Sequence, residues 1–128
     1  RPKHAVFLLA GADFPSLTQE SSMTAEFLRR AGIKPQELRQ AWRGIDPLDY
    51  AAGNADKDVL LINARSDRVV PRANGLKLKE AFPAGRQEWV SLGHYSAIFH
   101  LIWMPGRVAR EFKEKLRRAR LDKEASPP

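Results

Sequence analysis

Two side chains with complementary acid–base chemistry stand just after two stretches of the chain that have the character of strands. Asp67 follows the run 58–64, and His94 follows the run 87–92. An imidazole can take a proton from a hydroxyl nucleophile near neutral pH and later return it to a leaving group. A carboxylate bonded to the other ring nitrogen holds the correct tautomer and stabilises the charged ring. We therefore expect Asp67 and His94 to be the acid and base of a catalytic site.

Simpler roles stay open for these residues. Asp67 could cap the helix expected to begin near Pro71, since aspartate is common at helix starts and turns. His94 could be a loop histidine that bonds only to the backbone. Asp13 follows the first apolar stretch and is a second candidate acid, for which a turn residue is the more ordinary interpretation.

The remaining histidines predict no metal site. His4 is expected at the surface, and His100 is expected to be a structural residue inside an apolar helix. No pair has the His-x-x-x-His or Glu-x-x-His spacing that places two ligands on one helix face. We expect neither a metal nor a cofactor.

The apolar pattern predicts an α/β protein with a mainly parallel sheet and a three-layer α/β/α arrangement. Strands are expected over residues 5–10, 59–62 and 87–92, and the mixed pattern of the last suggests an edge position. The expected helix caps are Ser16, Asp46 and Ser96, the expected helix starts include Pro35 and Pro47, and Gly32 is an expected helix stop. The helices are expected over residues 16–31, 35–43, 47–51, 71–82, 97–103 and 107–121, with a break at Pro105-Gly106 before the last. Alternation of strands and helices indicates parallel strands joined by right-handed crossovers.

Composition narrows the class of protein further. The chain has 128 residues, enough for one domain, and no cysteine, which excludes disulfides, thiolate metal sites and a cysteine nucleophile. No apolar run is long enough to span a bilayer. The net charge is +7, and residues 107–120 hold seven basic and two acidic side chains. A basic helix can attract nucleic acid, but a solvated helix face is the commoner role, so nucleic-acid binding is not our first expectation.

Residues from about 4 to 116 resemble the C-terminal half of an α/β-hydrolase, closest to the esterase, dienelactone hydrolase and acyl-peptidase-like branch. The resemblance is carried by the segments 46–50, 59–63, 65–71 (Arg-Ser-Asp-Arg-Val-Val-Pro) and 93–96 (Gly-His-Tyr-Ser). It implies that Asp67 is the acid and His94 the base of a Ser-Asp-His triad. It also implies that the three strands are the last three of the family's sheet, and that residues 14–53 lie where such enzymes insert a cap. Residues 1–121 would form part of one such domain, with 122–128 as a flexible tail.

The chain departs from the family pattern at the nucleophile. The family's serine lies in a Gly-x-Ser-x-Gly turn upstream of these strands, and none of the seven serines here has that context. The resemblance therefore implies a serine hydrolase of carboxylic esters or related acyl bonds, with a small-molecule acyl substrate and the missing N-terminal half of the same fold as partners. A non-catalytic binding module of the same fold is the main alternative.

Overall fold

The computed structural model describes residues 3–100 and 102–125, which fall into two compact units that divide after residue 97. The strands are β1 (His4–Leu8), β2 (Asp58–Ala64) and β3 (Arg86–Val90). The first unit also contains α1 (Phe14–Glu20), α2 (Ala25–Arg30), α3 (Pro35–Ala41), the 3₁₀ turns η1 (Pro47–Tyr50) and η2 (Ala52–Asn54), α4 (Arg72–Ala81) and the start of α5 (His94–His100). The second unit is built around α6 (Met104–Ala125).

The three strands form one parallel sheet in the order β1-β2-β3, so the expected parallel α/β class is confirmed. Leu61 of β2 lies between Phe7 of β1 and Gln87 of β3. The expected edge position of the third strand is also confirmed, because β3 pairs on one side only within the described sheet.

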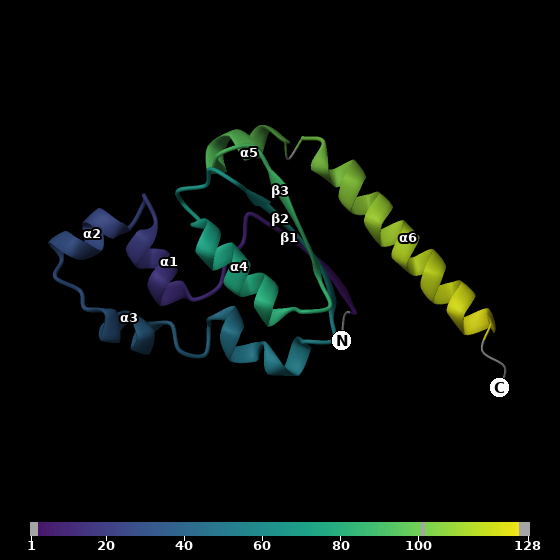
Figure 1. The fold of residues 1–128 in the computed structure, drawn as a ribbon, viewed down its shortest axis with the longest axis horizontal. Helices are drawn as coiled ribbons and strands as arrows, with labels where there is room; N and C mark the ends of the chain where they lie inside the picture. Colours follow the sequence, from purple (N-terminus) through teal and green to yellow (C-terminus); the bar gives the residue numbers. More distant parts are fainter. Residues whose placement is uncertain (1–2, 101, 126–128) are drawn as a thin grey trace. The chain divides into compact units, whose positions relative to one another are not determined.

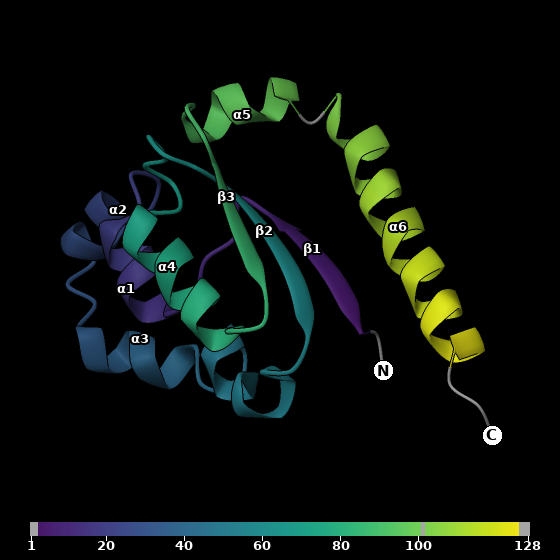
Figure 2. The same ribbon diagram turned by 45° about the vertical axis from the view of Figure 1, so that its right-hand side comes forward.

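The core lies between β2 and the helices of the first unit. Val59 and Leu61 pack with Leu78 and Ala81 of α4 and with Phe82, which follows that helix, and all five are buried. Figures 1 and 2 both show α1, α3 and α4 on the same side of the sheet. Side chains alternate along a strand, so Leu60 and Ile62 face the opposite side, where they are also buried.

The first expected helix begins earlier than the sequence indicated and is broken in two. Asp13, not Ser16, is the N-cap of α1, and its carboxylate accepts from the backbone N–H of Ser16. Ser16 instead bonds Glu20 within the helix, at 3.0 Å. The buried Ser21 ends α1 in an extended conformation, and a new helix starts four residues later. Gly32 follows α2 with φ of 66°, as its predicted role as a helix stop requires.

The expected start of α5 was wrong by three residues. The helix begins at His94, and Ser96, the predicted cap, lies in its first turn. The Ser96 hydroxyl accepts from the Gly93 N–H at 3.0 Å, a reciprocal bond of the kind found at helix N-termini. His94 is therefore a residue of a helical first turn and not a loop histidine.

The last helix is longer than expected. Pro105 and Gly106 do not interrupt it, because they lie in the first turn of α6, where a missing N–H has no helical partner to lose. Residues 122–125 of the expected flexible tail are helical, and 126–128 lie outside the described residues.

Large aromatic side chains lie at the surface. Trp103 is 79% exposed and Tyr50 is 56% exposed. His100 is also exposed, where a structural role was expected. Within the described part of the chain, no helix is long and apolar enough to cross a membrane.

Candidate functional site

The parallel pairing of β2 and β3 brings Asp67 and His94 together. The hydrogen-bond ladder continues past the strand ends, with Arg65 N–H donating to the Val90 carbonyl at 2.9 Å and Ser66 N–H to the Leu92 carbonyl at 3.0 Å. The residues that follow are Asp67 on one side and Gly93-His94 on the other. Because parallel strands end at the same edge of the sheet, this register places the two side chains within reach of each other.

Asp67 performs two tasks with its two carboxylate oxygens. Oδ1 accepts from the backbone N–H groups of Val69 and Val70, each at 2.8 Å, and so shapes the loop. Oδ2 lies 2.8 Å from Nδ1 of His94. The Asp67 side chain is only 2% exposed, whereas that of His94 is 22% exposed. The carboxylate is thus shielded from water while the imidazole keeps access to it.

His94 presents its second ring nitrogen for other chemistry. The Asp67 carboxylate can only accept a bond, so Nδ1 carries the proton and Nε2 is the basic atom in the neutral ring. No hydrogen bond from residues 3–100 or 102–125 occupies Nε2. This is the arrangement of an orienting acid and a proton-accepting base.

Asp13, the second candidate acid, contacts Lys77 instead of a histidine. Its carboxylate forms an ion pair with the Lys77 ammonium of α4. That hydrogen bond raises the pKa of Lys77 above its ordinary value, because the carboxylate favours the charged amine. Asp13 also has a left-handed backbone, with φ of 59°, while capping α1. It is a structural residue of the loop that follows β1.

Asp46 was not among the predicted site residues, yet it organises the same loop. It is 6% exposed and accepts from three backbone N–H groups: Asp13 at 3.1 Å, Leu48 at 2.9 Å, and Phe14. The expected capping role before Pro47 is confirmed by the bond to Leu48. The bonds to Asp13 and Phe14 cross more than 30 residues of sequence, and no local pattern could indicate them.

Two buried asparagines hold the carbonyl groups of the β1 loop. Asn63 donates to the Ala10 carbonyl at 2.7 Å, and Asn74 donates to the Ala12 carbonyl at 2.9 Å and the Asp13 carbonyl at 3.2 Å. The sequence offered one weak signal, a polar residue at the end of an apolar strand. Their bonds fix a loop whose backbone includes two non-glycine residues with positive φ, Leu9 and Asp13.

An apolar pocket of about 380 Å³ lies beside β1, and the sequence did not predict its position. Segment 14–53, expected as a cap region, contributes Phe14, Leu17, Pro47 and Tyr50 to its wall. A separate backbone bond ties this segment to the acid loop, from Ser22 N–H to the Arg68 carbonyl at 2.7 Å. The segment therefore contacts both the pocket and the loop that carries Asp67.

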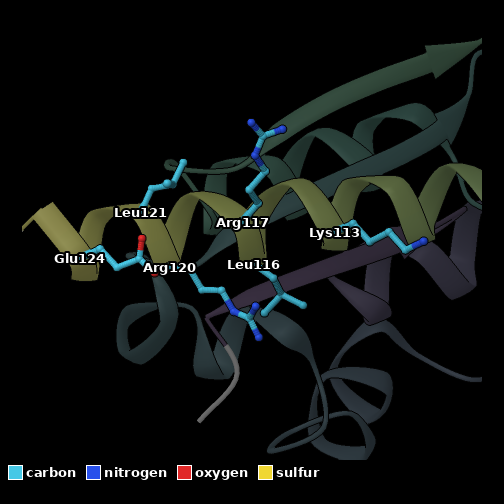
Figure 3. Close-up of a pocket in the computed structure, with 6 residues that line it drawn as sticks. All are labelled: Lys113, Leu116, Arg117, Arg120, Leu121 and Glu124. Carbon is cyan, nitrogen blue, oxygen red and sulfur yellow. The ribbon is translucent and has the colours of Figure 1, made fainter.

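A second hollow lies along α6 and is a poorer candidate. Figure 3 shows its lining, which comes from this helix alone: Lys113, Leu116, Arg117, Arg120, Leu121 and Glu124. The labelled side chains leave the helix in different directions and do not converge on one point. A surface formed by one helix cannot enclose a ligand, so we place the candidate site in the first unit.

Two arginines flank the candidate acid. Arg65 and Arg68 are both exposed, and neither forms an ion pair with another described residue. In the described part of the chain, no group of three His, Asp or Glu side chains is arranged to hold a metal ion.

Comparisons of the chain with protein-family models, with curated proteins and with solved structures find no match. The functional proposal therefore depends on the geometry of the site and on the resemblance of its sequence motifs.

Proposed function

We propose that this chain supplies the acid and the base of a Ser-Asp-His triad in a serine hydrolase that acts on a carboxylic ester or a related acyl bond. The observation that carries the proposal is the 2.8 Å contact between the buried Asp67 carboxylate and Nδ1 of His94, with Nε2 left to act. The order of acid before histidine along the chain is the order that the α/β-hydrolase resemblance implies.

Each residue has a defined part in this mechanism. Nε2 of His94 takes the proton of the serine hydroxyl as the oxygen attacks the acyl carbon, and later gives it to the leaving alcohol or amine. Asp67 keeps the proton on Nδ1 and stabilises the imidazolium that forms. Asp67 remains charged throughout, and its two bonds from Val69 and Val70 keep it in place. No cofactor is required.

The proposal places the nucleophile outside these 128 residues, because none of the seven serines lies in a Gly-x-Ser-x-Gly turn. Ser96 is the serine closest to His94 in sequence, but its hydroxyl is bonded to both the N–H and the carbonyl of Gly93. We propose that the serine and the oxyanion hole belong to the N-terminal half of the same fold. In the described sheet β1 pairs only with β2, so its outer edge has backbone groups to offer a further strand.

The same proposal includes the finer architecture. The strands would be the last three of an α/β-hydrolase sheet, and a second helical layer would complete a three-layer α/β/α arrangement. Leu60 and Ile62 support this, because two buried aliphatic side chains face away from the α4 side of the sheet.

A fluorophosphonate probe tests the proposal. The polypeptide extended upstream to include any Gly-x-Ser-x-Gly segment should label on one serine, and His94→Ala should nearly abolish both labelling and ester turnover. Unchanged turnover in His94→Ala would reject the role of the histidine. An extended polypeptide with no reactive serine would favour the alternative, a non-catalytic module that keeps Asp67 and His94 for structure.

A further inference from the structure

The pocket beside β1 has an almost wholly apolar wall. Leu17, Val70, Leu78 and Phe82 contribute aliphatic and aromatic surface, and no side chain that is charged at neutral pH lines it. The one polar side chain, Tyr50, directs its hydroxyl to the Gly44 carbonyl. A ligand held here would gain affinity from burying hydrocarbon and not from pairing charge.

The residues that line the pocket are spread along the length of α4. Val70, at one end, precedes the start of α4, while Leu78 lies in its second half and Phe82 is its C-cap. α4 has ten residues and is therefore about 15 Å long at 1.5 Å per residue. The ring of Phe7 of β1 lies tilted against that of Phe82, with the ring centroids 6.0 Å apart, and forms part of the wall at this far end. The lining thus extends along the helix and fits an elongated chain better than a compact ring.

One end of the pocket meets the acid loop. The Val70 side chain lines the pocket, and the Val70 N–H donates to Asp67 Oδ1 at 2.8 Å. A chain bound along β1 would therefore have one end beside the loop that orients His94. On the basis of these three observations, we infer that the pocket binds the aliphatic chain of the substrate, so that the enzyme acts on esters with a medium-length unbranched alkyl or acyl group. This inference rests on the proposed function for its link to catalysis, although binding itself needs no serine.

The test is a titration of the chain with decanoate, followed by the methyl resonances of its leucines and valines. Saturable shifts should centre on Leu17, Val70 and Leu78. Butyrate carries the same charge with a shorter chain, and it should bind at least about tenfold more weakly because it buries less apolar surface.

A matched pair of variants locates the binding. Leu17→Phe adds bulk to the pocket and should weaken decanoate binding about tenfold. Leu28→Phe makes the same change on α2, away from the lining, and should leave the affinity for decanoate unchanged. Circular dichroism would verify that both variants stay folded. Shifts confined to leucines outside this pocket, such as the exposed Leu116 and Leu121, would overturn the inference. Equal binding of butyrate, or equal weakening by both variants, would also overturn it.

The two proposals fail in different ways. Decanoate binding in the pocket, without a reactive serine in the extended polypeptide, would retain the pocket assignment and reject the hydrolase. A reactive, His94-dependent serine without decanoate binding would retain the hydrolase and reject this choice of substrate.

Discussion

The loops after β1 and β2 each present an aspartate at the carboxyl edge of the same sheet, but they use it differently. After β2, a single aspartate makes both kinds of contact: Asp67 bonds its own loop through Oδ1 and His94 through Oδ2. After β1, two aspartates share these contacts, because Asp46 bonds the loop amides while Asp13 pairs with Lys77.

This difference favours Asp67 over Asp13 for the proposed role of catalytic acid. The Asp67 side chain is nearly inaccessible, and its Oδ2 contacts an imidazole, a group that can accept and release a proton. Asp13 is more exposed, and its partner is the Lys77 ammonium, which stays charged at neutral pH. Asp13 therefore has no partner that exchanges a proton at that pH. A carboxylate at a strand end becomes an acid–base partner through the side chain that it meets.

The largest expected effect is a difference in catalytic rate between substitutions in the two loops. In the extended, active polypeptide, Asp67→Asn should lower kcat by roughly 10³–10⁴-fold, because the amide can stabilise the wrong imidazole tautomer and cannot stabilise the imidazolium. Asp13→Asn should stay within about threefold of wild type, since Asp13 does not contact His94. Steady-state ester hydrolysis measures both variants.

Two outcomes of these variants would contradict the difference between the loops. Equal losses in the two variants would show that the loops act as one structural unit. An effect confined to Asp13→Asn would move the acid to the β1 loop.

The next effect concerns the residue that organises the β1 loop. Asp46→Ala should reduce the free energy of unfolding by about 1–3 kcal/mol, because it leaves partly buried N–H groups of Asp13, Phe14 and Leu48 without an acceptor. Urea denaturation followed by tryptophan fluorescence measures this. Asp46→Asn keeps one acceptor oxygen and should cost less, and the reverse ranking would contradict this account.

Removing the carboxylate of Asp13 should have a smaller effect. Asp13→Ala should destabilise by about 1 kcal/mol, the usual cost of losing a helix N-cap. Asp13→Asn keeps the cap and tolerates the left-handed backbone, so its unfolding midpoint should lie closer to wild type. Equal losses for Asn and Ala would assign the stabilisation to the ion pair instead, because both substitutions remove the carboxylate that pairs with Lys77.

The smallest expected effect is a pH dependence on the β1 side. The raised pKa of Lys77 means that its contact with Asp13 stabilises the fold fully below the ordinary lysine pKa. That contribution disappears as the pH rises from the ordinary value through the raised one. Thermal unfolding between pH 9 and 12 should show this alkaline loss in the wild type and a weaker one in Lys77→Met. Identical alkaline profiles would exclude the contact as a source of stability.

Much of the fold could be predicted because its signals are local. The buried strand at 59–62, the Pro35 start of α3 and the helix stop at Gly32 each depend on residues within one or two turns. One error arose where a distant group intervened, because Ser22 bonds the Arg68 carbonyl where a continuous helix was expected. The other was a choice between neighbouring residues, since Asp13 caps α1 in place of Ser16.

By itself, the sequence determined the kinds of elements, their order and the chemistry available at the strand ends, because periodicity and capping act over a few residues. It proposed Asp67 and His94 as partners but left Asp13 as a rival. Only the tertiary structure decided between them, since the β2–β3 register carries Asp67 to His94 while α4 brings Lys77 to Asp13. The apolar pocket likewise belongs to the tertiary structure, because its wall joins residues from Phe7 to Phe82 that only packing brings together.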